Sequence, residues 1–563
     1  MVQVLKNDLA PDHPEGYVLT IDKRGVTIEF REPPGLRAAA ATFRQLLRQF
    51  GRRLPCLKIR DWPDFARRGV MLDISRGRVP RLETLLDLAS KLAELKINEL
   101  QLYTEHTFAY QRHKSVWQSW GALTAREIRI LDTHCRSLGI DLVPNQNSFG
   151  HLRYFLADPS LKELGELAEP YEAETKDFLR RPTTLAPDHP GTLPFLKGLY
   201  DELLPNFSSH YFNVGCDETW DLGKGQSRKV CQRKGNGQVY LDFLKQIHHE
   251  VSQRGKTMMF WGDIILKYPQ LIKFLPKEVV ALNWGYEADH PFAKEAAQFA
   301  RANIPFYVCP GTSTWQTIIG RHDNALANLR AAAKVGKRYG AIGFLNTDWG
   351  DGGHPQPLAV SWPLFAGGAA LAWNAKELDE RALISILNRD IYEDASGKVA
   401  SAALALGVAH QKLGAKAANE TPLGTVIAAP RPEDRELFCR NGLKWHAKIP
   451  RDRVRAALKE IRKQRAELRR GKYESDSALL LATELDLAAR MAELSCQYML
   501  WQQSISEHSA SARSQAAGCI RALRQLEADY KFLWPLRNKA TPRHSMPFLQ
   551  WRIQELERSI QSS

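Results

Sequence analysis

The chain has 563 residues, of which 44% are hydrophobic and 25% charged, a balance typical of a globular protein with room for more than one domain. No apolar run approaches the roughly 18 residues that a bilayer-spanning helix needs, so we expect no membrane span. The first residues lack the basic flank and apolar core of a secretory signal. We therefore expect a cytoplasmic protein, although a chain whose signal had been removed would read the same.

Eight cysteines are scattered along the chain without a Cys-x-x-Cys spacing. This pattern predicts neither a disulfide framework nor a zinc knuckle, and reduced, buried thiols are expected instead. No group of His, Asp and Glu shows a metal-ligand spacing. We expect neither a metal nor a cofactor.

The first 62 residues form the first predicted unit. Residues 17–21 and 26–30 are β-rich runs joined at a Lys-Arg-Gly turn, and residues 36–50 carry apolar side chains at helical spacing. We interpret residues 1–62 as a small, truncated α/β domain.

A different pattern follows, in which short apolar runs alternate with helical segments. The eight strand candidates are 70–74, 99–103, 140–144, 211–214, 257–260, 279–283, 306–309 and 342–346. Helical periodicity lies between them, for example over 82–95, 125–137, 240–253 and 325–335. Eight strands with intervening helices favour a closed parallel α/β barrel over an open sheet, so we predict a (β/α)8 TIM barrel over residues 63–425.

Strand signals disappear after about residue 430. Residues 454–470, 476–504 and 511–533 are long amphipathic segments, which predict an α-helical C-terminal domain over residues 426–563. Its Lys and Arg outnumber its Asp and Glu, in a chain of formal net charge +15. The aromatic residues are not interleaved with the basic ones, so a solvated helix surface is favoured over a nucleic-acid site. An acidic partner stays open as the alternative.

Asp217 and Glu218 come directly after the apolar run at 211–214. At the carboxyl end of a barrel strand, two adjacent carboxylates suppress each other's ionisation. A pair whose pKa values are separated in this way suits one proton donor and one group that stays anionic. The dipeptide alone also fits a solvated loop or an acidic helix N-terminus.

Tryptophans follow several of the other predicted strands. Trp261, Trp284 and Trp349 each come at the end of a strand candidate, and Trp315 lies just beyond the strand at 306–309. Several tryptophans at one barrel mouth favour an apolar box for a ligand over a packed core.

Four ordered motifs now give a family resemblance. Residues 65–76 (FARRGVMLDISR), 98–105 (NELQLYTE), 144–151 (PNQNSFGH) and 214–218 (VGCDE) resemble the first strands and the Gly-x-Asp-Glu signature of glycoside hydrolase family 20. The opening residues 16–21 and 35–46 are similar to the small domain that precedes its barrel. The resemblance covers roughly residues 15–375.

The resemblance implies a substrate-assisted reaction, in which the 2-acetamido oxygen of the substrate is the nucleophile. Glu218 would be the general acid and base, and Asp217 would hold the acetamido nitrogen. Trp261, Trp284 and Trp349 would enclose the acetamido group.

Further sugar contacts follow from the same resemblance. Arg68 would donate to the 3- and 4-hydroxyls, whereas a barrel salt bridge is its alternative role. Asp351 would accept from the 4- and 6-hydroxyls, although its Asp-Gly setting is also an ordinary turn. His151 is either a substrate contact or a hydrogen-bonded structural histidine.

Two departures from the family pattern concern the same site. Glu105 stands after the second strand, where the family commonly has Asp. The family's tyrosine after the seventh strand is missing, and Tyr307 lies within the strand, so whether it reaches the acetamido oxygen is open. We keep Glu105, Tyr307 and Trp315 as candidate substrate contacts.

The function expected is that of a retaining exo-β-N-acetylhexosaminidase acting on terminal non-reducing β-linked GlcNAc or GalNAc in glycans or glycoconjugates. The alternative is a non-catalytic carbohydrate-binding protein that kept the barrel. The carboxylate pair favours the enzyme, and the altered seventh strand favours the alternative.

Overall fold

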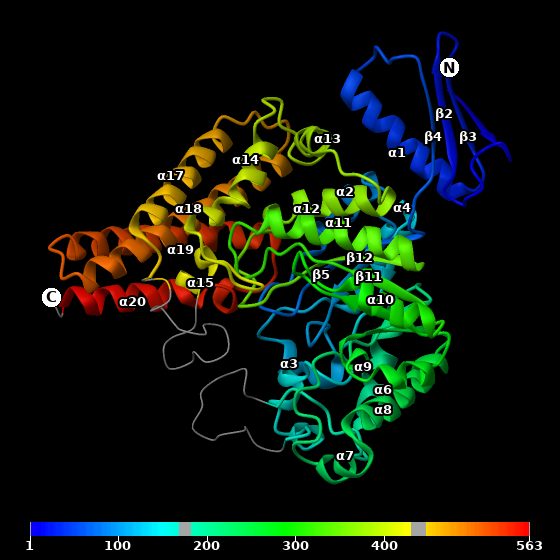
Figure 1. Cartoon of the computed structure of the whole chain (residues 1–563), viewed down its shortest axis with the longest axis horizontal. Coiled ribbons are helices and arrows are strands. Elements are labelled where there is room, and N and C mark those ends of the chain that lie inside the picture. The colour runs from blue at the N-terminus through cyan, green and yellow to red at the C-terminus, as the bar shows by residue number, and fades with distance from the viewer. Residues whose placement is uncertain (1, 168–181, 429–445, 447, 562–563) are drawn as a thin grey trace.

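The computed structural model describes residues 2–167, 182–428, 446 and 448–561, and Figure 1 shows their arrangement. A small N-terminal sheet with one helix stands at one corner of the molecule. A parallel barrel forms the centre, and long helices from the C-terminal part of the chain lie side by side on its flank.

The N-terminal unit is a four-stranded sheet in the order β1-β3-β2-β4. Its elements are β1 (Val2–Lys6), β2 (Tyr17–Asp22), β3 (Gly25–Phe30), α1 (Pro33–Phe50) and β4 (Leu57–Asp61). The predicted hairpin and helix are confirmed, because α1 buries alanines such as Ala38 and Ala39 in one core with Leu19 and Ile28. Strands β1 and β4 were not predicted; β1 is an exposed edge strand without an alternating apolar pattern.

Eight parallel strands form the barrel, in the order β7-β6-β5-β12-β11-β10-β9-β8. They are β5 (Arg67–Asp73), β6 (Glu99–Tyr103), β7 (Asp141–Val143), β8 (Tyr211–Asn213), β9 (Thr257–Trp261), β10 (Val280–Trp284), β11 (Phe306–Cys309) and β12 (Gly343–Asp348). A bridge between Asn145 and Asn213 joins β7 to β8 and closes the ring. The predicted (β/α)8 barrel is confirmed, with all eight strands at the expected places.

Helices surround the ring. They include α2 (Leu82–Glu94), α3 (Lys114–Trp117), α4 (Ala125–Leu138), α5 (Arg153–Leu156), α6 (Thr192–Leu203), α7 (Arg228–Lys234), α8 (Asn236–Ser252), α9 (Asp263–Leu266), α10 (Phe292–Arg301), α11 (His322–Tyr339) and α12 (Trp362–Trp373). Alternate strand side chains enter two separate cores: Met71 and Leu345 pack inside the barrel, whereas Val70 and Phe344 pack outward under the helices.

In the described residues after α12, the regular elements are helices. These are α13 (Glu380–Ile386), α14 (Val399–Leu406), α15 (Pro422–Ala428), α17 (Arg451–Leu468), α18 (Asp476–Ser506), α19 (Ala512–Arg537) and α20 (Pro547–Gln561). Helix α20 was not predicted. Helices α14 and α15 already contact α17 and α18, and the predicted domain limit at residue 425 stays a prediction.

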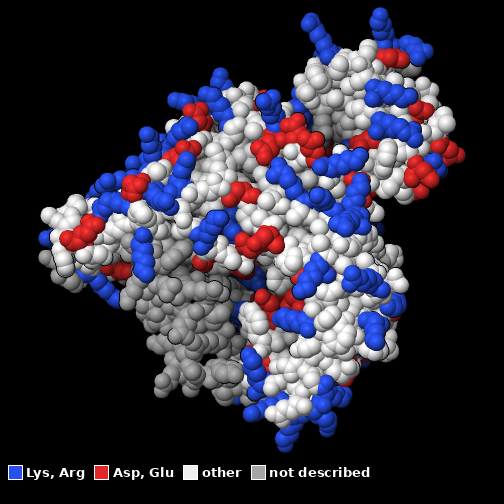
Figure 2. Space-filling view, in the orientation of Figure 1, with Lys and Arg blue, Asp and Glu red and all other residues white. Residues whose placement is uncertain are grey.

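Basic side chains on this helical region alternate with acidic ones (Figure 2). Arg465 pairs with Asp486 at 2.6 Å, and Arg451 pairs with Glu507 at 2.6 Å. These two arginines are thus neutralised locally. Among the described helices, none combines the length and the apolar character that crossing a bilayer requires.

Candidate active site

Asp217 and Glu218 lie in a tight turn directly beyond β8. Cys216 and Glu218 both have positive φ values, 69° and 46°, which side-chain-bearing residues rarely adopt. The turn also needs glycine nearby: a Cβ at Gly150 would lie 2.2 Å from the Asp217 carbonyl oxygen, and one at Gly215 would lie 1.9 Å from Asn147 Oδ1. Such local strain is typical of functional sites.

His151 connects the two carboxylates. Its Nε2 lies 3.2 Å from Asp217 Oδ2 and 3.3 Å from Glu218 Oε2, and its Nδ1 lies 3.6 Å from Glu105 Oε1. The Asp217 side chain is 10% exposed and that of Glu218 is 32% exposed. Glu218 therefore meets solvent more freely than its neighbour, as a proton donor to a leaving group must.

The charges around His151 decide its protonation. Burial alone would lower the pKa of His151, but the Asp217 and Glu218 carboxylates outweigh it and raise this pKa to about 10. At neutral pH the ring is therefore an imidazolium held between carboxylates. The structure places His151 and Glu105 beside the catalytic pair; their predicted contact with substrate stays a prediction.

Asp263, at the start of α9, is a third carboxyl beside the pair. Its Oδ2 accepts from the Glu218 backbone N–H at 3.3 Å. Burial raises the pKa of Asp263 to about 7, and the Asp217 carboxylate adds to the rise. Its carboxyl holds the turn that presents Glu218.

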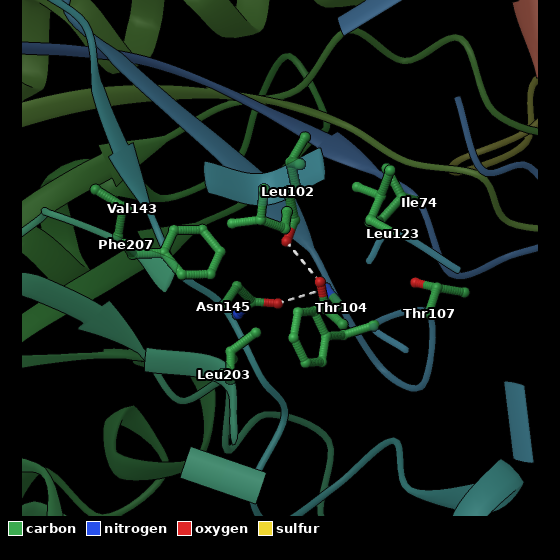
Figure 3. A pocket seen from close by; sticks show the side chains of 11 residues that line it. Ile74, Leu102, Thr104, Thr107, Leu123, Val143, Asn145, Leu203 and Phe207 are labelled. Carbon is green, nitrogen blue, oxygen red and sulfur yellow. Dashed lines mark hydrogen bonds between the residues drawn. The ribbon is translucent and has the colours of Figure 1, made fainter. Parts of the chain in front are cut away.

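Hydrogen bonds at the ends of β6 and β7 fix Glu105. The Tyr103 hydroxyl donates to Glu105 Oε1 at 3.1 Å and accepts from Asn147 Nδ2 at 2.7 Å. Thr104 ties the strand ends together, because its backbone N–H donates to Asn145 Oδ1 at 2.6 Å (Figure 3). Figure 3 also shows a small cavity, which is lined by residues such as Leu102, Thr104 and Asn145. None of its lining residues is a predicted site residue.

An aromatic cluster stands next to the carboxylates. Trp261 and Trp349 lie with ring centroids 5.9 Å apart, and Trp284 stacks on Tyr286 at 5.1 Å. Trp315 meets the Tyr286 ring edge-on at 5.0 Å. The four predicted tryptophans are thus brought together, in one interior cluster with Tyr286.

Several polar atoms of this region have no protein partner among the described residues. They include Asp217 Oδ1, Asp263 Oδ1 and the indole N–H groups of Trp261, Trp284 and Trp349. Buried polar atoms are nearly always satisfied, so these donors and carboxylate oxygens at one place indicate a site for a polar ligand.

Arg76, which follows β5, reaches the same region. Its guanidinium pairs with Asp73 Oδ2 at 2.8 Å, Asp351 Oδ1 at 3.3 Å and Glu105 Oε1 at 3.5 Å. The Arg76 guanidinium carbon also lies over the Tyr103 ring and over the Trp349 ring, 5.0 and 5.1 Å from their centroids. Asp351 keeps a 32% exposed side chain, so Arg76 and Asp351 together form a charged, solvent-accessible pair.

The prediction for Arg68 is wrong. Arg68 stands at the start of β5, where its guanidinium pairs with Glu15 Oε1 at 2.6 Å and donates to the carbonyls of Phe65 and Lys96. The start of β5 lies at the barrel end opposite to Asp217 and Glu218. The alternative role, a structural salt bridge, is what the structure has.

Tyr307 as a substrate contact is also wrong. The Tyr307 hydroxyl donates to Glu99 Oε2 at 3.0 Å and accepts from Arg67 Nε at 3.1 Å inside the N-terminal end of the barrel. Register explains this, because Tyr307 pairs with Gly343 at the beginning of β12.

Three residues of the site were missed. Arg76 closes the quoted motif 65–76, and it follows the strand, which is where barrel active sites lie. Tyr286 comes two residues after Trp284, and its place directly after a barrel strand would have indicated it in the same way. Asp263, two residues after Trp261, gave the same signal.

His151, Asp217 and Glu218 also have ligand-type atoms that lie within 4.8 Å of one another. The sequence spacing did not predict this grouping, because His151 follows β7 and the Asp217–Glu218 turn follows β8, and only the fold brings them together. The same three side chains form ion pairs, in which His151 Nε2 lies 3.2 Å from Asp217 Oδ2 and 3.3 Å from Glu218 Oε2.

A closed parallel barrel that presents adjacent carboxylates, an imidazolium and a tryptophan cluster at the carboxyl ends of its strands has the architecture of a glycoside hydrolase. Models of two domains match this chain: the glycosyl hydrolase family 20 catalytic domain over residues 65–327, and domain 2 of that family over residues 2–62. The chain belongs to glycoside hydrolase family 20.

Curated relatives are similar over part of their length. The chain is 28% identical over 311 residues to a Beta-hexosaminidase of Vibrio furnissii, covering 47% of this chain and 49% of the relative. It is 26% identical over 230 residues to Hexosaminidase D of Bos taurus, covering 39% and 63% respectively. The chain thus matches about half to three fifths of the length of these relatives.

Solved structures share the fold. The Flavobacterium johnsoniae chitobiase is 17% identical, with a TM-score of 0.57, and the match covers 94% of this chain and 88% of that one. The N-acetyl-beta-hexosaminidase of Streptomyces plicatus is 20% identical, with a TM-score of 0.54, over 72% and 83% of the two chains.

Proposed function

We propose that the protein is a retaining exo-β-N-acetylhexosaminidase that removes terminal β-linked GlcNAc or GalNAc from glycans. The observation that carries the proposal is the Asp217–Glu218 pair, bridged by His151 and facing a tryptophan cluster with unsatisfied N–H groups. Relatives named hexosaminidases support the choice of an N-acetylated sugar.

In the first chemical step, the acetamido oxygen of the substrate forms a bond to the anomeric carbon while the glycosidic bond breaks. Glu218 gives its proton to the departing oxygen. Asp217 accepts the acetamido N–H and offsets the positive charge of the oxazolinium-type intermediate. The greater exposure of Glu218 and the open Oδ1 of Asp217 support this division of roles.

In the second step, water attacks the anomeric carbon from the side of the departed group. The Glu218 carboxylate takes the proton from that water, and the acetamido group reopens. The anomeric configuration is retained, because two displacements occur at one carbon. His151 stabilises both carboxylates while Glu218 cycles between its two protonation states.

Tyr286 is our candidate for the donor to the acetamido oxygen. After β11, where the family commonly has a tyrosine, this chain continues as Pro310-Gly311-Thr312. A Cβ at Gly311 would lie 2.8 Å from both the Tyr286 and the Trp315 rings. The Tyr286 ring thus occupies the space beside the end of β11. A hydroxyl there, next to three tryptophans, would orient the acetamido oxygen for attack.

Arg76 and Asp351 would bind the sugar hydroxyls, with Arg76 in the role that the sequence assigned to Arg68. Their paired charges offer both donors and acceptors to vicinal hydroxyls. Both epimers at C4 fit such a pair, so side-by-side rates on GlcNAc and GalNAc substrates decide the preference.

The proposal is tested with an aryl β-N-acetylglucosaminide. We expect the wild type to hydrolyse it and Glu218→Gln and Asp217→Asn to lose most of that activity. A thiazoline that mimics the oxazoline intermediate should inhibit the wild type competitively. Sugar binding without turnover in wild type and variants alike would favour a carbohydrate-binding protein instead.

A further inference from the structure

The α-helical C-terminal region contacts the two barrel loops that carry Arg76 and Asp351. Tyr530, on α19, is buried between them. Its hydroxyl accepts from Arg78 Nη2 at 3.1 Å and donates to the Pro355 carbonyl at 2.8 Å. One side chain of the helical region therefore bridges the loop after β5 and the loop after β12.

A second contact lies closer to the site. Ser545, in the segment between α19 and α20, donates from Oγ to the Gly77 carbonyl at 3.0 Å. Gly77 and Gly353 have φ values of +104° and +97°, and a Cβ at Gly353 would lie 2.9 Å from the His544 carbonyl. The backbone of the helical region thus packs directly on residues next to Arg76 and Asp351.

A backbone seam continues this contact along the first loop. The Lys539 N–H donates to the Val79 carbonyl at 2.8 Å, and the Arg81 N–H donates to the Arg537 carbonyl at 2.9 Å. The loop after β5 thereby pairs with the end of α19 through a short antiparallel bridge between Pro80 and Asn538.

We propose that the C-terminal helical region positions Arg76 and Asp351 for binding of the terminal sugar, with Tyr530 as the positioning residue. Neither loop is a regular element, so each would lose conformational freedom when substrate binds. Fixing both loops beforehand removes that cost from binding. The identity of the sugar in this inference rests on the proposed function. The bridge made by Tyr530 is observed independently of that function.

The test compares Tyr530→Phe with Tyr473→Phe. Both variants lose one tyrosine hydroxyl of the helical region, but that of Tyr473 donates to the Leu468 carbonyl within the region itself. For Tyr530→Phe we expect KM for an aryl β-N-acetylglucosaminide to rise about 3- to 10-fold with kcat changed less than about 2-fold. Tyr473→Phe should leave both constants at wild-type values.

Ser545→Ala should raise KM in the same direction, and the double variant with Tyr530→Phe should exceed either single change. An active wild type with an unchanged KM in the double variant overturns the inference and leaves the proposed function standing.

An inactive wild type would contradict the proposed function, and amide hydrogen exchange then tests the bridge. Exchange over residues 74–81 and 349–356 should be faster in the double variant than in Tyr473→Phe. Equal protection in the two variants overturns the inference.

Discussion

The two ends of the barrel both bury charged and tyrosine side chains, yet they differ in how far those groups are satisfied. At the N-terminal end, Glu99 accepts from Arg67, Tyr307 and Gln101, at distances between 2.7 and 3.0 Å. At the C-terminal end, Asp217 Oδ1 and three indole N–H groups have no partner among the described residues. The carboxylate at the N-terminal end is thus satisfied by protein groups, whereas the groups at the C-terminal end are free to bind a ligand.

The backbone shows the same contrast. Positive φ values occur at His151, Cys216 and Glu218, whereas the strand residues that form the N-terminal network lie in regular β5, β6 and β11. The residues that stabilise the fold therefore lie at one end of the barrel, and the strained residues of the proposed active site lie at the other. Matched substitutions at the two ends test this separation.

The largest expected effect is on the acid and base. We expect Glu218→Gln to lower kcat on an aryl β-N-acetylglucosaminide by about 10²- to 10⁴-fold, because the amide cannot protonate the leaving oxygen. Glu99→Gln, the matched change at the other end, should keep kcat while it lowers the free energy of unfolding by about 3 kcal/mol. Steady-state kinetics and chemical denaturation measure the two effects. Similar losses of kcat in both variants would contradict the separation.

The two tyrosines give a second pair. Tyr286→Phe should lower kcat by about 10²-fold, as loss of one donor to a reacting oxygen does. Tyr307→Phe removes a hydroxyl that is hydrogen-bonded to Arg67 and Glu99 at the N-terminal end of the barrel, so its kcat should stay within about 2-fold of wild type. If Tyr286→Phe keeps full activity, another group holds the acetamido oxygen.

The two arginines give a third pair, in which the sequence favoured the wrong member. We expect Arg76→Met to raise KM by about 10-fold or more, since charge-assisted hydrogen bonds to the sugar are lost. Arg68→Met leaves the half-buried Glu15 without its partner and should act on thermal stability, with KM unchanged. A raised KM in Arg68→Met would place the sugar elsewhere.

The pH dependence of stability provides a smaller test. The pKa of His151 is about 10 in the folded chain against an ordinary value of 6.5. A raised pKa means that the stabilisation is complete below pH 6.5 and is lost as pH rises to about 10. The Tm difference between wild type and His151→Gln should therefore shrink across this window. A difference that stays constant between pH 6.5 and 10 would show that the ring is neutral when folded.

The smallest expected effect is that of metal removal. Although His151, Asp217 and Glu218 gather ligand-type atoms, the proposed chemistry uses them for protons and charge. Dialysis against EDTA should leave kcat unchanged, with added Zn²⁺ as the control for inhibition at the same atoms. Loss of activity that returns with a divalent ion would contradict this role.

Sequence patterns located the barrel and its reacting pair, because both depend on local order. Eight apolar runs marked the strands, and Asp217–Glu218 followed one of them directly. Arg68 and Tyr307 failed for a common reason: each stands near the beginning of its strand, and strand direction sends the beginning to the opposite end of the barrel. Applying strand direction to the motif would have selected Arg76.

Other features could not be read from the chain in this way. Tyr530 contacts Arg78, which is 452 positions away in sequence, and Pro355, which is 175 positions away. A local sequence pattern does not predict such contacts. The contact of His151 with Asp217 and Glu218 likewise depends on how closely Gly150 lets two turns approach.

The central claim is that the acetamido group of the substrate is the nucleophile at the Asp217–Glu218 site. The most direct measurement compares hydrolysis of an aryl β-N-acetylglucosaminide with that of the matching aryl β-glucoside, which lacks the acetamido group. We predict turnover of the first and none of the second. Equal rates on the two substrates would contradict the claim, because a nucleophile of the protein would then be required.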